Sequence, residues 1–296
     1  MRALVTTLVL LAATNADADV VAKPAPFSLG WSLRPAGPVN VVRSDTAIGL
    51  FDDGGASGST VASTFLVAYK VSPELSPLLR FAVIHNDPAT GGTATAMSNP
   101  LVGAMWAPPI VEAPYKLAFF GGLALPLGEG GGNAANPTMT STVRSAIAAR
   151  SSMDNAMFAI NDLTPIVGID AAYVANGLTL QLEATVFELF RVRGEDVQPD
   201  AYKTNFTSGA QAAYFVFDWL SAGAELRYQR WLSTPAAVEM APATRDTVSA
   251  AVGVRGHFAV GGPRWLRPGV SYARGLDDPM TGRNYQIVQI DVPFAF

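Results

Sequence analysis

The sequence predicts an all-β protein, a transmembrane antiparallel up-and-down β-barrel of about twelve strands with short periplasmic turns and longer extracellular loops. Three observations predict this class. Segments of roughly ten residues alternate between apolar and polar side chains, the connections between them are long and short in turn, and aromatic residues gather at strand ends beside the short connections. An even number of strands also places both ends of the chain on the same side of the membrane.

The composition agrees with a membrane barrel. The 296-residue chain is 49% hydrophobic and 15% charged, whereas soluble domains average about 25% charged residues. Beyond the N-terminus the sequence has no uninterrupted apolar run of about 18 residues, so a spanning helix is not expected. A closed barrel is then the remaining way to satisfy backbone groups in lipid. The formal net charge of -4 gives no footprint for binding nucleic acid.

Residues 1–18 have the pattern of an export signal. Arg2 forms a short basic region, residues 3–13 form an apolar core, and Ala16-Asp17-Ala18 is a small-x-small cleavage site. The mature chain is therefore expected to begin at Asp19. A short buried helix is the alternative interpretation.

Residues 19–43 form a Pro-rich segment that precedes the barrel. Phe27, Leu29, Trp31 and Leu33 alternate within it, so both a strand and a packed periplasmic segment remain open. Because proline is poorly tolerated inside a ladder of strands, the first full strand is expected near residues 44–51. The barrel is then expected to span residues 44–296.

The spanning strands are predicted from residues two apart that share an apolar face. In chain order these faces are Val61, Phe65, Val67 and Tyr69; Leu79, Phe81 and Val83; Leu117, Phe119, Leu123 and Leu125; Val167, Ile169, Ala171 and Tyr173; Leu178, Leu180, Leu182, Ala184 and Val186; Ala222, Ala224, Leu226 and Tyr228; Val248, Val252, Val254 and Phe258; Leu266, Val270 and Tyr272; and Val288, Ile290, Val292, Phe294 and Phe296.

The connections alternate in length along the chain. The long polar ones, expected outside the cell, lie near residues 52–58, 86–95, 127–162, 193–204, 232–246 and 275–283. The short ones, expected in the periplasm, lie near residues 72–76, 107–114, 176–177, 218 and 259–263. A soluble sandwich has no reason for this regularity. Aromatic residues at the strand ends beside the short turns predict an interfacial girdle of Trp106, Tyr115, Phe217, Trp219, Phe258, Trp265, Phe294 and Phe296.

The last twelve residues predict a closing strand, although an edge strand of a soluble sheet would show the same alternation. A terminal aromatic residue such as Phe296 resembles the assembly signal of outer-membrane barrels. The expected partners are therefore outer-membrane lipid and lipopolysaccharide, the barrel-assembly machinery through this strand, and a small-molecule solute. No nucleic acid is expected.

Charged residues on the polar faces are expected to line the lumen, because Arg or Lys facing lipid at mid-height costs about 2–4 kcal/mol. The lumen-lining candidates are Lys70, Arg80, Asp170, Glu183, Glu225, Arg227, Arg255 and Asp291. Two outcomes stay open at a width of about twelve strands: an open or gated channel, or a closed interior filled by paired charges.

The connection over residues 127–162 is too long for a plain loop, so it is expected to contain structure of its own. Residues 143–150 are good helix formers. An exposed loop would leave the apolar side chains of Met153, Met157, Phe158 and Ile160 in contact with water. We expect this loop to fold into the barrel mouth, with Arg144, Arg150 and Asp154 as constriction candidates. A lid over the rim and an adhesive surface loop are the alternatives.

No catalytic, cofactor or metal site is predicted. The two histidines, His85 and His257, are expected at opposite rims, and no serine has diagnostic spacing to either. Clustered His or Cys residues that would bind a metal are absent from the sequence.

Two segments resemble a known family. They are Ser98-Asn-Pro-Leu-Val-Gly-Ala-Met-Trp106 and Lys116-Leu-Ala-Phe-Phe-Gly-Gly-Leu-Ala-Leu-Pro-Leu-Gly128. They resemble the phenol-degradation-pathway (MetA-pathway) family of bacterial outer-membrane β-barrels, with Leu127 in place of that family's threonine. The resemblance implies a barrel of the Gram-negative outer membrane that passes small solutes, hydrophobic or aromatic ones among them. The alternatives are a closed structural or surface-interaction barrel and, behind it, a lipid-modifying barrel enzyme.

Overall fold

The computed structural model describes residues 27–109, 111 and 113–296. The predicted export signal over residues 1–18 and the predicted mature start at Asp19 lie outside the described residues.

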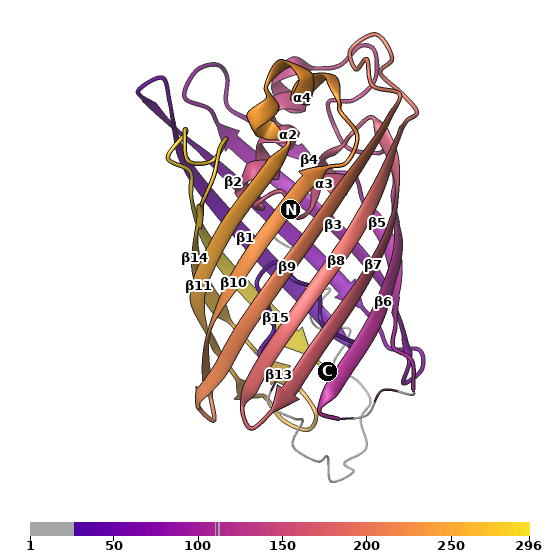
Figure 1. Cartoon of the computed structure of the whole chain (residues 1–296), viewed down its shortest axis with the longest axis vertical. Coiled ribbons are helices and arrows are strands. Elements are labelled where there is room, and N and C mark those ends of the chain that lie inside the picture. Colours follow the sequence, from indigo (N-terminus) through magenta and orange to yellow (C-terminus); the bar gives the residue numbers. More distant parts are fainter. Residues whose placement is uncertain (1–26, 110, 112) are drawn as a thin grey trace.

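The described chain forms a closed antiparallel barrel of 12 strands, which confirms the predicted fold class (Figure 1). The strands are β1 (Val41–Asp53), β2 (Ala56–Ala68), β3 (Leu75–Asp87), β4 (Ala94–Met97), β5 (Leu101–Trp106), β6 (Tyr115–Ala124), β7 (Asp162–Ala175), β8 (Leu178–Arg191), β9 (Tyr202–Phe217), β10 (Leu220–Trp231), β11 (Asp246–Gly256), β12 (Phe258–Ala259), β13 (Trp265–Leu266), β14 (Gly269–Gly275) and β15 (Gln286–Ala295). The pieces β4, β12 and β13 extend spanning strands past local irregularities.

Each spanning strand pairs with its neighbour in the sequence, and the ring closes where β1 pairs with β15. That closing pair runs from Val41 opposite Ala295 to Leu50 opposite Gln286. The helices are α2 (Pro137–Ala149), α3 (Asn155–Phe158) and α4 (Ala236–Met240), with a 3-10 turn η2 (Pro242–Thr244). In the described part of the chain, no helix has the length and hydropathy needed to cross a membrane.

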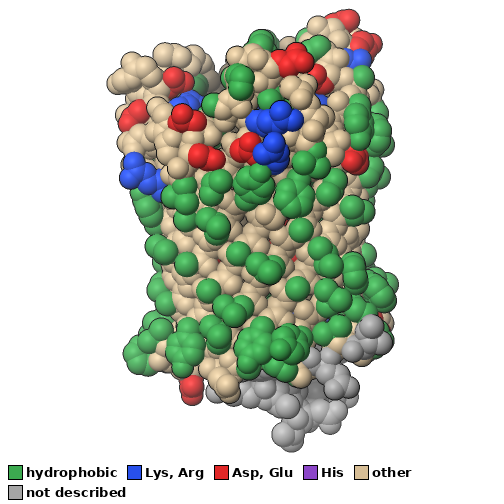
Figure 2. Space-filling view, in the orientation of Figure 1, with side chains coloured by type: hydrophobic (Ala, Val, Ile, Leu, Met, Phe, Trp, Pro, Cys, Tyr) green, Lys and Arg blue, Asp and Glu red, His purple; other side chains and the backbone are tan. Residues whose placement is uncertain are grey.

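Alternation along the strands separates the wall into two faces, as the sequence predicts. On β15, Ile290 and Val292 are exposed on the outside, while Gln289 and Asp291 are buried inside. On the face shown in Figure 2, charged side chains gather at the loop end, and the wall below them is hydrophobic or neutral. This outer surface suits hydrocarbon, because its polar groups point inward.

Aromatic residues are exposed near the short turns, where the girdle is predicted. Phe217 and Trp219 stack at 5.8 Å, and Trp219 stacks on Phe258 at 6.4 Å. Trp106 stacks on Phe119 of the next strand at 5.6 Å.

One predicted long loop is wrong. Instead of a loop over residues 52–58, β1 and β2 pair as far as Asp53 and Ala56, so Gly54 and Gly55 alone make the turn. Both glycines have positive φ, 59° and 89°, which is the backbone of the tight hairpin turns that match strand twist. Two of the other long connections hold the helices: α2 and α3 lie between β6 and β7, and α4 with η2 lies between β10 and β11.

The part of the Pro-rich segment that the structure describes before β1, residues 27–40, is neither a strand nor a periplasmic segment, so both alternatives are wrong for these residues. Residues 27–40 contain no strand, and β1 begins at Val41 instead of Ser44. Leu29, Trp31 and Leu33 are buried, and the backbone of Trp31 and Arg34 bonds to inward side chains of β8, β10 and β15. The segment therefore runs inside the barrel.

Candidate functional site

Two chain segments occupy the lumen. We call residues 27–40 the N-terminal plug and residues 125–161 the inserted loop. The plug has Trp31 and Leu33 at 2% and 1% exposure, so its apolar side chains are removed from water inside the cylinder.

Inward side chains of the wall satisfy the plug's backbone in place of a sheet partner. The amide of Ser32 donates to Glu225 at 3.2 Å, and the amide of Trp31 donates to the same carboxylate. In the other direction, Arg43 donates to the carbonyl of Trp31 at 2.6 Å, and Arg255 donates to the carbonyl of Leu29 at 3.1 Å. Carboxylates thus hold the amides of the plug, and arginines hold its carbonyls.

Arg34 of the plug lies between two carboxylates. Asp170 on β7 is directly opposite Glu183 on β8, and both point inward. Arg34 Nε lies 3.3 Å from Asp170 Oδ2, and its Nη1 lies 3.3 Å from Glu183 Oε1. The guanidinium also covers the ring of Phe120 at 4.8 Å. Like charges this close repel, and the Arg34 guanidinium between the two side chains offsets that repulsion.

A second cluster crosses the line where the ring closes. We call Arg43, Asp45, Arg255 and Asp291 the closing cluster. Asp291 on β15 accepts from Arg43 of β1 at 2.7 Å and from Arg255 of β11 at 2.5 Å, and it is fully buried. Asp45 accepts from Gln289 at 2.9 Å.

The inserted loop packs against one half of the wall. Val143, Ala146 and Ala149 of α2 are buried in an apolar cluster with Ala62 of β2 and Ile84 of β3. The predicted helix over residues 143–150 is present and begins earlier, at Pro137, because Asn136 accepts from the amides of residues 138 and 139. Met153, Met157, Phe158 and Ile160 are all buried, as their apolar character predicts.

Asn99, within the first family-like segment, fixes the root of this loop. Its Oδ1 accepts from the amide of Gly128 at 2.9 Å, and its Nδ2 donates to the carbonyl of Ala159 at 2.8 Å. Gly128 has no room for a side chain, since a Cβ there would lie 2.8 Å from Ile160 and 2.9 Å from Asn99. One buried amide therefore holds both ends of the inserted loop.

Ion pairs fix the tip of the inserted loop to the wall. Arg80 of β3 donates to Asp154 through both Nη atoms, at 2.5 and 2.8 Å. Arg150 donates to the same carboxylate at 2.9 Å and lies 2.7 Å from Asp45 of β1. Burial alone would raise the pKa of Asp154, but the two arginines outweigh it and lower the pKa to about 2.

The low pKa of Asp154 predicts an acid-sensitive loop. Because the folded pKa lies below the ordinary value of 3.8, the stabilisation is complete above pH 3.8 and is lost as the pH falls toward about 2. We expect the ionic current through planar bilayers that contain the protein to be flat from pH 7 to about 4 and to rise below that. Asp154→Asn should give a higher current at every pH, without this rise. A rise already present between pH 7 and 5 would contradict the assignment to Asp154.

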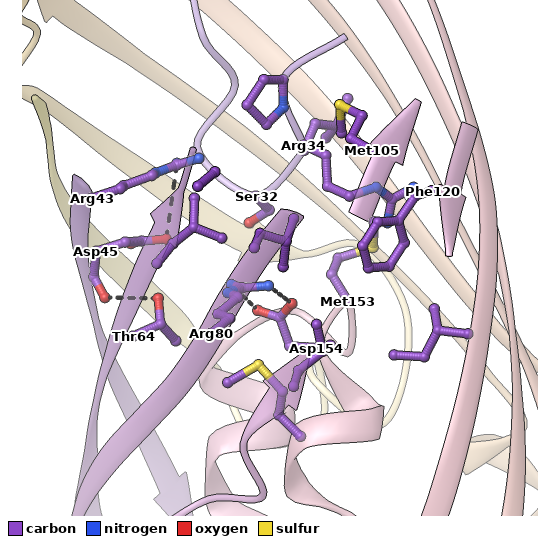
Figure 3. A pocket seen from close by; sticks show the side chains of 18 of the residues that line it. Ser32, Arg34, Arg43, Asp45, Thr64, Arg80, Met105, Phe120, Met153 and Asp154 are labelled. Carbon is purple, nitrogen blue, oxygen red and sulfur yellow. Dashed lines mark hydrogen bonds and ion pairs between the residues drawn. The ribbon is translucent and has the colours of Figure 1, made fainter. Parts of the chain in front are cut away.

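Between the plug and the inserted loop lies a chamber of about 70 Å³ (Figure 3). Arg80 and Asp154 point toward each other at its edge, while Met105, Phe120 and Met153 lie on its apolar side. This volume is enough for a few water molecules and too small for an organic solute.

Above the inserted loop, the lumen widens into a vestibule of about 800 Å³. We define the outer vestibule by the elements that line it, which are α2 on one side and the outer ends of β1, β2, β3, β10 and β11 on the other. Arg144 faces this space.

The structure places most of the lumen-lining candidates on the inner side of the barrel wall. Arg80, Asp170, Glu183, Glu225, Arg227, Arg255 and Asp291 all point inward, in the contacts described above or, for Arg227, in a pair with Glu225 at 2.8 Å and a bond to Ser151 of the inserted loop at 3.0 Å. Lys70 is the exception. It lies exposed beyond the end of β2, because the strand stops at Ala68 and its amide bonds to Asn40.

Sequence reasoning missed Arg34, Arg43 and Asp45. Arg43 and Asp45 have the same period-two signal as the other candidates, on a strand whose start the sequence places at Ser44. Arg34 lies outside any predicted strand, so no alternation could identify it.

The histidines lie at opposite ends of the barrel. His85, at the outer end of β3, bonds to Thr95, while His257, after β11, lies 2.8 Å from Ser221 Oγ. The charged groups that act on His257 are Arg255 and Arg267, whereas a catalytic triad needs a carboxylate there. Among the residues the structure describes, no group of three or more His, Cys, Asp or Glu could hold a metal ion.

No protein-family model matches the chain, and no curated protein matches its sequence. Among solved structures, the COG4313 outer-membrane channel from Pseudomonas putida F1 is similar with a TM-score of 0.55 and 13% identity, over 93% of this chain and 100% of that chain. The NanC porin is similar with a TM-score of 0.50 and 8% identity, over 86% of this chain and 98% of that chain. At these identities the likeness shows the fold, which is that of bacterial outer-membrane β-barrels.

Proposed function

We propose that this protein is a gated channel of the Gram-negative outer membrane for small organic solutes. The observation that carries the proposal is the way the lumen is filled. The N-terminal plug has no strand partner and is held by polar contacts to inward side chains, which water could replace if the segment moved. A barrel built only as a scaffold would be filled by its own wall side chains.

The apolar side of the chamber, once movement of the plug has enlarged the space, would suit solutes with an apolar face, including the hydrophobic or aromatic ones that the family-like segments imply. Met105, Phe120 and Met153 offer a surface that adapts to such a face. The COG4313 and NanC structures, which are called a channel and a porin, support transport as the role of this architecture. Insertion through β15 by the barrel-assembly machinery, and contact with lipid and lipopolysaccharide, belong to the same proposal.

The chain contains no Cys, so a single disulfide can test whether the plug must move. Ser28 Oγ of the plug lies 2.8 Å from Ser221 Oγ of β10, which makes the pair a site for cross-linking. In the double variant Ser28→Cys, Ser221→Cys, we expect oxidation to slow liposome swelling in small sugars and amino acids to the level of empty liposomes. Reduction should restore the wild-type rate.

The single variants Ser28→Cys and Ser221→Cys are the matched controls and should not respond to oxidant. Equal swelling of the locked and reduced double variant would show that solutes pass without movement of the plug. If wild-type protein gives no swelling in any solute, the barrel is a closed structural one.

A further inference from the structure

We infer that the outer vestibule is a binding site for hydroxylated organic anions, the class of sugar acids, and that Arg144 holds their carboxylate. The inference deepens the proposed channel function by naming a solute class for its outer entrance. The vestibule of about 800 Å³ lies within the range of roughly 300–1,000 Å³ in which proteins bind small molecules.

The lining of the outer vestibule carries hydroxyl and amide groups among apolar side chains. They come from α2, from the rest of the inserted loop, from η2 and from four strands of the barrel: Thr60, Asn86, Thr140, Ser141, Ser145, Ser152, Asn155, Asn161, Gln229, Thr244 and Thr247. Trp231 adds an aromatic surface on β10. A sugar ring presents hydroxyls at its edge and an apolar face, so it matches both kinds of group.

Arg144 gives the vestibule its charge preference. Arg150 is engaged with Asp45 and Asp154, and Arg283 pairs with Asp53 at 3.0 Å while covering the ring of Phe51. Among the described residues, none forms an ion pair with Arg144. Asp53 is the acidic side chain among those that line the space, and Arg283 already neutralises it. The remaining positive charge favours an anion, and the guanidinium fork suits a carboxylate.

Asn155 supplies a second, buried contact. It lines the vestibule at 3% exposure, and its Nδ2 donates to Asn205 Oδ1 at 3.1 Å. Its own Oδ1 has no partner among the described atoms. A buried acceptor without a donor is costly, and a hydroxyl of the ligand is a donor of the right kind. The two contacts together distinguish a hydroxylated acid from a neutral sugar and from an acid without hydroxyls.

The test is isothermal titration of the full-length protein in detergent micelles with D-glucuronate, D-glucose and benzoate as probes. Wild type should bind glucuronate about tenfold more tightly than glucose or benzoate. Arg144→Gln should remove about tenfold of the glucuronate affinity and leave glucose unchanged, and Arg144→Lys should keep most of the preference. Asn155→Ala should weaken glucose and glucuronate alike.

Arg274→Gln is the matched control. It makes the same change of charge on the outer wall of β14, where Arg274 bonds only to Asn284, so glucuronate binding should not change. Equal affinity for benzoate and glucuronate, or an unchanged Arg144→Gln, would overturn the inference. Tight binding without any liposome swelling would instead remove the proposed channel function and leave the binding site standing.

Discussion

Replacing residues 28–36 of the plug with a Gly-Ser segment of equal length is expected to raise single-channel conductance about tenfold, since a barrel of this strand number is wide enough for a passage once it is emptied. The replacement removes Trp31 and Leu33 from the lumen and takes the Arg34 cation from its two acids. Conductance steps in planar bilayers at fixed salt are the measurement. The cation preference should also increase, because Asp170 and Glu183 would then face the open path.

Point variants of Arg34 separate a loss of charge from a loss of chain. Arg34→Met should open the channel partway, since it leaves the facing carboxylates without their counter-ion. Arg34→Lys keeps the charge and should stay near wild type. If the Gly-Ser variant conducts no more than wild type, then the inserted loop alone sets the resistance, and the plug is a structural strut.

The second large effect is expected on stability, at the closing cluster. Asp291→Ala leaves the guanidiniums of Arg43 and Arg255 buried without their shared carboxylate, and removing one partner of a buried pair costs about 3–5 kcal/mol. The measurement is the free energy of unfolding in urea for protein folded into lipid vesicles. Loss of the compact band of unheated samples in gel electrophoresis should accompany the shift.

Gln286→Ala on the same strand is the control, because Gln286 bonds to Tyr272 near the outer surface and should cost little. The triple variant Arg43→Met, Arg255→Met, Asp291→Met should recover much of the lost stability, since apolar residues can replace a buried ionic group of similar volume. An Asp291→Ala protein as stable as wild type would mean that Asp45 and the backbone carbonyls compensate both arginines fully.

The wall of the barrel is predictable from sequence because each strand carries its own signal. Leu178 to Val186 alternates without interruption, and its polar residues Gln181 and Glu183 do point into the lumen. The helix in the inserted loop is predictable in part, since residues 143–150 are good helix formers, whereas its first turns from Pro137 depend on the cap at Asn136. The errors lie at the ends of strands. The strand before Lys70 ends earlier than predicted, and Gly54 with Gly55 forms a two-residue turn where the composition predicts a long loop.

The segments that fill the lumen cannot be predicted in the same way, because their contacts join residues far apart in the chain. Arg34 meets Asp170 and Glu183, and Trp31 meets Glu225, across more than a hundred positions. No local pattern records such pairs. The prolines near Trp31 argue correctly against a strand, yet they cannot indicate that the segment lies inside the cylinder instead of beneath it. Pairing of the charged candidates likewise becomes visible only once the register of the strands is known.

The position of the plug constrains the order of assembly. Residues 27–40 lead directly into β1, and β1 completes the ring by pairing with β15, the last strand described. A segment in extended contact with β8, β10 and β11 is most easily laid against those strands while the sheet is still an open, curved ribbon. The final pairing of β1 with β15 then encloses the plug. During biogenesis the plug would then guide the curvature of the sheet as the barrel closes. Barrels that lack the plug should accumulate as unclosed intermediates when synthesis is rapid.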